Sequence, residues 1–353
     1  MTLTRWLPLP PTPDQGRSRL RNCAVVLAFV AAATACGPGY VAPDRDRGLS
    51  ESPLRPGVDH EPLSGRLLDG MNAMRDTDYE AARQAFEEHL SKYPRSALAM
   101  YHLGLVAMAE NKRAEARIHF EEAIAANPQL HGALSNLGIL YLADDEEVAA
   151  QKVLEQAATL APDDARVWSN LGAVRLRRGL WSEAIEALKK ASELAPGHGS
   201  ILYNLALAWM ERQEYGEALK ALDQALEMRP RFAQAWAAKV ACLQGLGRVA
   251  EAEQVGREAE RTLPQLGPDN RVALARVLVL QRKVDDAIEQ LNKGVEQYPD
   301  DAGALLALGE LLDAKGDKVA ALETYQRFLK APGRRSDDVR RIRDRCKQLG
   351  ASR

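Results

Sequence analysis

The stretch from Ala165 to His198, ARVWSNLGAVRLRRGLWSEAIEALKKASELAPGH, decides the fold of this 353-residue chain. Its apolar residues fall three or four apart in two groups, which Gly179 separates and Pro196 closes. Apolar residues at this spacing form one face of an α-helix, and proline ends a helix because it lacks the amide hydrogen. The stretch therefore predicts two helices joined by a tight turn.

This hairpin recurs every 34 residues. Prolines stand at Pro94, Pro128, Pro162, Pro196, Pro230 and Pro264, and then at Pro299 after 35 residues. Alanines follow the same rhythm at Ala82, Ala116, Ala150, Ala184, Ala218, Ala252, Ala287 and Ala321. Both series shift by one residue near Gly267. We therefore divide the chain into eight units, 63–96, 97–130, 131–164, 165–198, 199–232, 233–266, 268–301 and 302–335.

The pattern resembles the tetratricopeptide repeat, a helix–turn–helix of 34 residues. The residues that carry the resemblance are Trp168 at position 4, Leu171 and Gly172 at 7 and 8, Gly179 at 15, Ala184 at 20, Leu188 at 24, Ala191 at 27 and Pro196 at 32. Small residues let the helices approach, and large ones fill the remaining space. The expected fold is all-α, a right-handed α-solenoid of about eight repeats.

The array is expected to weaken at one unit and to be capped at its end. The sixth unit has atypical residues at three packing positions, Lys239, Val240 and Gly256, and should be the loosest internal unit. After Ser336, apolar residues recur at helical spacing, namely Val339, Ile342, Cys346 and Leu349. The charged residues Arg340, Arg341, Arg345 and Lys347 are expected on the opposite face. Residues 336–353 therefore read as a basic capping helix and tail.

The N-terminus has the pattern of an export signal. Three arginines, Arg17, Arg19 and Arg21, precede a short apolar run that ends at Cys36. Residues 33–36, Ala-Thr-Ala-Cys, resemble a bacterial lipobox, although Ala33 replaces the usual leucine. The resemblance implies a signal peptide over 1–35, a palmitate-type lipid on Cys36 and a flexible tether over 36–62. An uncleaved anchor or an ordinary secretory signal is the alternative.

The residue after the cysteine bears on the target membrane. In lipoproteins of this kind an aspartate there is typical of inner-membrane retention, and this chain has Gly37. The resemblance therefore favours a lipid-anchored protein of the outer membrane facing the periplasm. Cys242 and Cys346 would remain in the mature chain, too far apart in a solenoid for a disulfide.

In this family the first helix of each unit lines a concave groove. Asn136, Asn170 and Asn204 occupy position 6 in three successive units. An amide both donates and accepts hydrogen bonds, so a ladder of amides can hold the backbone of an extended peptide. Neighbouring groove candidates are Tyr101, His102, Leu105, Ile139, Tyr203, Leu207 and Met210. The alternatives are that the asparagines serve local hydrogen bonds and that several apolar residues belong to the core.

The groove changes toward the C-terminus, where Arg276, Glu310 and Asp313 replace apolar residues. They indicate either a second, more polar partner surface or a solvated face. Residues 331–353 hold eight basic and three acidic residues, which suit an anionic partner or membrane, or solubility alone.

The sequence lacks the charge and the motifs that are typical of nucleic-acid-binding proteins, metalloproteins and enzymes. The net charge of −2 does not suit a nucleic-acid partner. The chain has no His-x-x-x-His pair, no glycine-rich phosphate loop and no Gly-x-Ser-x-Gly elbow. We therefore expect no catalytic site, metal, cofactor or small-molecule substrate.

The order of lipobox, tether and repeat array resembles the tetratricopeptide lipoproteins of type IV pilus assembly and of gliding-motility complexes. Eight units favour a motility-type or other large complex. The expected function is a scaffold that binds other envelope proteins through extended peptide segments. The alternatives are an adaptor for peptidoglycan enzymes and a periplasmic chaperone-like carrier of unfolded outer-membrane polypeptides.

Overall fold

The computed structural model describes residues 65–350 apart from positions 264 and 335. These residues form seventeen helices and no strand, which confirms the all-α prediction. None of these helices is long and apolar enough to cross a membrane. The predicted signal peptide, the predicted lipidation site Cys36 and the predicted tether lie outside the described residues.

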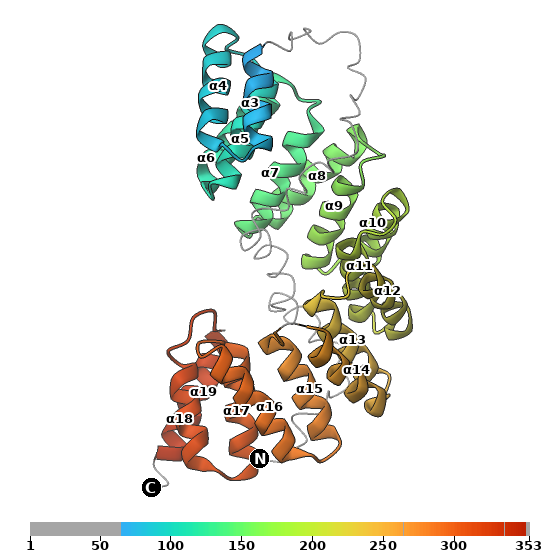
Figure 1. Cartoon of the computed structure of the whole chain (residues 1–353), viewed down its shortest axis with the longest axis vertical. Coiled ribbons are helices and arrows are strands. Elements are labelled where there is room, and N and C mark those ends of the chain that lie inside the picture. Colours follow the sequence, from blue (N-terminus) through green and yellow to red (C-terminus); the bar gives the residue numbers. More distant parts are fainter. Residues whose placement is uncertain (1–64, 264, 335, 351–353) are drawn as a thin grey trace. The chain divides into compact units, whose positions relative to one another are not determined.

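The helices come in pairs, one pair for each repeat (Figure 1). The pairs are α3 (Gly65–Arg75) with α4 (Tyr79–Lys92), α5 (Ala97–Ala109) with α6 (Arg113–Ala126), α7 (His131–Ala143) with α8 (Glu147–Leu160), α9 (Ala165–Arg177) with α10 (Trp181–Leu194), α11 (Gly199–Glu211) with α12 (Tyr215–Met228), α13 (Ala233–Gly245) with α14 (Val249–Thr262), α15 (Pro268–Leu280) with α16 (Val284–Gln297), and α17 (Ala302–Lys315) with α18 (Lys318–Phe328). A last helix, α19 (Ser336–Gly350), follows them. From the second repeat on, each first helix begins at the residue that opens its predicted unit.

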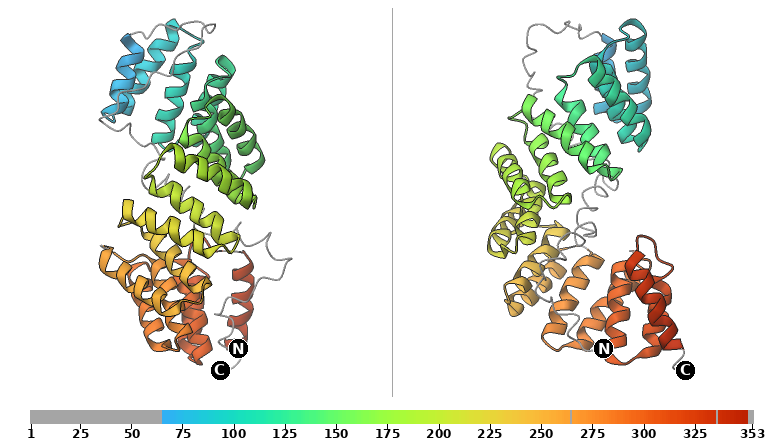
Figure 2. Two further views of the ribbon diagram at one scale, coloured as in Figure 1. Left: turned by 90° about the vertical axis from the view of Figure 1, so that its right-hand side faces the viewer. Right: turned by 180° about the vertical axis from the view of Figure 1, so that it is seen from behind.

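Two compact units divide the described chain at residue 194. We call residues 65–194, with α3–α10, the N-terminal unit, and residues 195–350, with α11–α19, the C-terminal unit. In both units the two helices of a repeat lie side by side and antiparallel, and both views in Figure 2 show this arrangement.

A glycine and a large side chain hold most pairs together. A Cβ atom on Gly104 would lie 2.5 Å from the Phe120 ring, and one on Gly172 would lie 2.5 Å from Leu188 Cγ. These distances are too short for real contacts, so only glycine lets the first helix approach the second this closely. The eight repeating alanines complete the contact, since all of them are 0% exposed.

The turn between the two helices is left-handed in all eight repeats. Position 15 has a φ between 60° and 96° in every unit, at Thr77, Asn111, Asp145, Gly179, Gln213, Gly247, Arg282 and Gly316. A side chain makes this conformation costly because Cβ approaches the carbonyl oxygen. Only three repeats use the glycine that suits it, so the other five accept some strain.

The sixth repeat reverses the pattern of small and large residues. Val240 occupies the usual glycine position and is 2% exposed, while Gly256 occupies the position of the large residue. A Cβ on Gly256 would lie 2.9 Å from Leu274 Cδ1, so a side chain of the seventh repeat fills the space. The helices α13 and α14 are the least closely packed pair of any repeat. This agrees with the expectation that the sixth unit is the loosest.

The last helix closes the C-terminal unit. Ile342 and Leu349 are 1% and 3% exposed and join the core beside Phe328. Val339 and Cys346 pack against the same core. The apolar stripe of α19 therefore covers the last repeat, as a capping helix must.

The charged face of α19 needs a correction. Arg341 Nη1 lies 2.6 Å from Glu310, and the Arg345 guanidinium binds both oxygens of Asp313 at 2.7 Å. Two of the four residues expected to face solvent therefore bind α17. Glu310 and Asp313 form neither a free partner surface nor a solvated face, because the capping helix neutralises them.

The two described cysteines are free thiols in different surroundings. Cys242 is 0% exposed, and burial raises its pKa to about 12. It packs as a small apolar residue. Cys346 belongs to α19 and is half-buried against the core of the last repeats.

Candidate peptide-binding surface

The first helices of the N-terminal unit are joined by side-chain hydrogen bonds at a constant offset. Asn136 Nδ2 donates to the Tyr101 hydroxyl at 3.5 Å, and Asn170 Nδ2 donates to the Ser135 hydroxyl at 3.0 Å. In both pairs the amide stands 35 residues after the hydroxyl, so α7 binds α5 as α9 binds α7. One N–H group of each amide is therefore bonded to the preceding repeat.

The amide oxygens are not occupied in the same way. No described residue donates a hydrogen bond to Oδ1 of Asn136 or Asn170, and both side chains are half-buried. A carbonyl oxygen accepts from a backbone N–H. The bond to the preceding repeat fixes the orientation of the amide, so acceptance is the function left for each oxygen.

Tyr101 is a packing residue as well as an acceptor. Its hydroxyl would lie 3.1 Å from a Cβ on Gly132, and its ring centroid lies 5.9 Å from that of Phe120. Gly132, at position 2 of the third repeat, leaves room for the tyrosine to cross between α5 and α7. Gly132 could not be singled out from the sequence, since Tyr101 stands 31 residues before it.

His102 is an aromatic packing group. Its ring stacks on Phe86 with a centroid distance of 5.2 Å and an angle of 10°. Burial lowers the pKa of His102 to about 4, so the ring is neutral at pH 7. His102 joins the first repeat to the second and brings no charge to the surface.

The apolar candidates divide between the surface and the core. Leu105 and Ile139 are half-buried, and Leu105 also packs against the cores of two repeats. Three positions later in the pattern, Leu142 and Leu176 are 5% and 2% exposed. The alternative that some groove residues belong to the core therefore applies at that position.

The two arginines near the asparagines have partners. Arg177 donates to the Leu142 carbonyl at 2.8 Å, which satisfies an oxygen at the end of α7. Arg166 binds both oxygens of Asp164, at 3.1 and 2.8 Å. Neither arginine resembles a free clamp for a terminal carboxylate.

In the C-terminal unit the predicted residues are less accessible. Tyr203 is 3% exposed, with its ring 5.0 Å from that of Phe232. Asn204 is 5% exposed, and its Nδ2 has no acceptor among the described residues. Leu207 and Met210 are half-buried on the same helix. The ladder of three asparagines stays a prediction, and its third member has little surface to offer.

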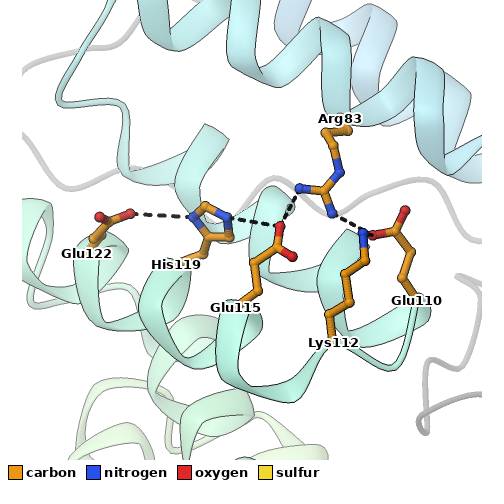
Figure 3. Close-up of polar contacts among 6 residues, drawn as sticks. All are labelled: Arg83, Glu110, Lys112, Glu115, His119 and Glu122. Atoms are coloured by element: carbon orange, nitrogen blue, oxygen red, sulfur yellow. Dashed lines mark hydrogen bonds and ion pairs between the residues drawn. The ribbon is translucent and has the colours of Figure 1, made fainter.

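Ion pairs on the second helices hold neighbouring repeats in register (Figure 3). Arg83 of α4 binds Glu110 and Glu115, which belong to the second repeat. His119 lies between Glu115 at 3.7 Å and Glu122 at 3.4 Å. One repeat later, Arg117 binds Glu146 at 2.7 Å. Arg83 and Arg117 both stand at position 21 of their repeats, and this shared position is the sequence signal for the contact.

The C-terminal unit uses this position with the charges exchanged. Glu253, again at position 21, accepts from Lys283 of the next repeat at 2.9 Å. The geometry of the contact is therefore set by the repeat, while the sign of the charge is free.

Comparison with known proteins agrees with this architecture. A tetratricopeptide repeat family model matches residues 67–131, 203–269 and 272–336, and a second one matches 163–231. No curated protein matches the sequence.

Several solved structures share the fold. A tetratricopeptide repeat protein from Parabacteroides merdae is 14% identical, with a TM-score of 0.55 over 70% of this chain and 97% of that one. Yeast Tom70 is 14% identical, with a TM-score of 0.57 over 85% of this chain and 66% of Tom70. Pseudomonas aeruginosa pilF is 18% identical, with a TM-score of 0.52 over 62% and 96%. At such identities the likeness concerns the fold alone. Together with the family models, it establishes that the chain belongs to the tetratricopeptide repeat family.

Proposed function

We propose that this chain is a lipid-anchored scaffold of a bacterial outer membrane, which holds extended segments of partner proteins against its first helices. The observation that carries the proposal is the pair of oriented amides, Asn136 and Asn170, one repeat apart. Their oxygens can accept from the backbone N–H groups of an extended segment, whatever its sequence. Half-buried Leu105 on α5 and Ile139 on α7 offer apolar contact on neighbouring first helices.

The anchor part of the proposal depends on the N-terminal sequence. Residues 33–36 resemble a lipobox, and Gly37 lacks the aspartate of inner-membrane retention. Acylation of Cys36 by several chains would hold the protein stably at the membrane, since one chain alone gives marginal binding. The layout of anchor and long array favours a large envelope complex, of the gliding-motility or type IV pilus type.

Crosslinking in cells tests the binding surface. The variant Asn136→Ala/Asn170→Ala should lose partner crosslinks that the parent protein shows in mass spectrometry. The matched control is Gln84→Ala/Gln156→Ala, which removes two exposed amides from the second helices α4 and α8. Unchanged crosslinks in the asparagine variant would refute the proposed surface. The identity of the crosslinked proteins separates a scaffold from an adaptor for peptidoglycan enzymes and from a carrier of unfolded outer-membrane polypeptides.

Fractionation tests the anchor separately. Cys36→Ala should release the protein from the outer-membrane fraction, whereas Cys242→Ala should not, because that thiol is buried in the repeat core. A Cys36→Ala protein that stays in the outer membrane would contradict lipidation and leave the binding surface untouched.

A further inference from the structure

The helix α19 uses its basic residues in two different ways. Arg341 and Arg345 turn toward α17 and pair with Glu310 and Asp313. Arg340, Arg343 and Lys347 are exposed and lie at spacings of three and four residues. Residues at these spacings share one side of a helix. The capping function therefore leaves three cations on the outer side of α19.

These three cations line an open depression of about 650 Å³. Its other lining residues are Gly333, Arg334, Ser336, Val339 and Asp344. The depression is lined by the segment before α19 and by the outer side of that helix, in the C-terminal unit. We call it the arginine depression.

The charges of the arginine depression do not balance. Four cations face one carboxylate, Asp344, which lies 3.4 Å from Lys347. The Arg334 guanidinium donates to the Ala331 carbonyl, which carries no charge. Arg340 and Arg343 have no acidic partner within the described part of the chain. Like charges this close repel one another, so an anion placed among them would be stabilised.

We propose that the arginine depression binds a carboxylate-rich segment of a partner protein. A guanidinium presents parallel N–H donors that match the two oxygens of a carboxylate, and three of the four cations are arginines. The concave shape lets these groups converge on one segment. This surface belongs to the C-terminal unit and includes neither Asn136 nor Asn170, so the inference does not depend on the proposed groove or anchor.

An anionic membrane surface fits the site less well. Helices that lie on membranes carry exposed apolar residues beside their cations. On α19 the apolar residues Ile342 and Leu349 are 1% and 3% exposed, and they pack into the protein. Val339, itself half-buried, is the one apolar residue with a sizeable side chain in the described lining.

A peptide titration tests the proposal. The probe is a fluorescent decaglutamate peptide, and the protein is the full chain in detergent, with folding checked by circular dichroism. Arg340→Ser/Arg343→Ser should weaken binding about tenfold, because two charge-assisted bidentate contacts are lost. The matched control is Arg231→Ser/Arg261→Ser, which removes two other exposed arginines from the same unit. The control should bind like the parent protein.

Three outcomes would overturn the proposal. The first is that decaglutamate does not bind the parent protein, and the second is that both double variants lose binding equally. The third is that phosphatidylglycerol vesicles, but not decaglutamate, bind the parent more tightly than Arg340→Ser/Arg343→Ser. That result would assign the cations to a lipid surface, and the lipid anchor cannot explain it, because both proteins carry the same anchor sequence.

Discussion

The two units build their first helices from the same repeat but finish them differently. In the N-terminal unit, Asn136 and Asn170 are half-buried and bound to hydroxyls of the preceding repeat. In the C-terminal unit the same position holds Asn204, which is 5% exposed, followed by Ala238, Ala273 and Ala307. The comparison teaches that the repeat fixes the backbone and leaves the surface positions free. The proposed backbone recognition therefore concerns the N-terminal unit.

Packing differs between the units in a parallel way. All four repeats of the N-terminal unit have glycine against a large residue, as in the Gly172–Leu188 contact. In the C-terminal unit, alanine replaces this glycine in the fifth and seventh repeats, at Ala206 and Ala275, and in the sixth repeat Gly256 lies against Leu274, whose nearest atom is Cδ1. The contrast predicts different tolerance to the same substitution, and hydrogen exchange measured by mass spectrometry can follow each unit separately.

The largest effect is expected at Gly172. Gly172→Val would force its Cβ against Leu188 Cγ, and overpacking of this kind costs about 3 kcal/mol. Gly256→Ala should cost less than about 1 kcal/mol, because Leu274 Cδ1 can move and alanine favours the helix. Hydrogen exchange should therefore accelerate in α9 and α10 for the first variant and change little for the second. Equal acceleration would contradict the contrast in packing.

The next effect concerns the end of the C-terminal unit. Arg345→Ala would leave Asp313 without its guanidinium partner, and the Asp313 side chain is only 4% exposed. An uncompensated buried carboxylate costs about 2 kcal/mol, reduced here because Arg345 is 24% exposed. Exchange should accelerate in α17 and α19. Lys347→Ala is the control, since that side chain is 80% exposed, and an equal effect there would argue against a structural ion pair.

A pH effect should distinguish the units. The pKa of His102 is about 4 in the folded protein, below the value of about 6.5 in an unfolded chain. Between these values the unfolded state binds more protons, so the N-terminal unit is stable above pH 6.5 and loses stability as pH falls toward 4. From pH 7 to 5 the loss should be about 1–2 kcal/mol.

Exchange at both pH values checks this, once corrected for the intrinsic rate. His102→Phe, which keeps an aromatic ring on Phe86, should reduce the loss in α4–α6. In the C-terminal unit, His198 is the one described histidine, and it is exposed. A loss of the same size in both units, or one that persists in His102→Phe, would show that carboxylates cause it instead.

Much of this structure follows from the 34-residue period. The start of α15 at Pro268, the burial of the repeating alanines and the apolar side of α19 were all predictable, because each depends on spacing along one chain segment. The hydroxyl partners of Asn136 and Asn170 were not, since they arise from how neighbouring repeats rotate against each other. Arg345 was placed on the wrong side, because a long side chain can reach an acid that helical spacing alone does not reveal.

The smallest expected effect is a gain in stability. Thr77 holds the left-handed turn of the first repeat with φ 61°, where its branched side chain is strained. Thr77→Gly should stabilise the N-terminal unit by about 0.5–1 kcal/mol, less than the full strain because glycine gains entropy in the unfolded chain. The opposite substitution can be made in the C-terminal unit. Gly247→Ala, at a residue with φ 72°, should lower the stability of that unit by a similar amount. If hydrogen exchange slowed in neither α3 nor α4 of Thr77→Gly, then the five non-glycine turns would be unstrained, and turn chemistry would not distinguish the repeats.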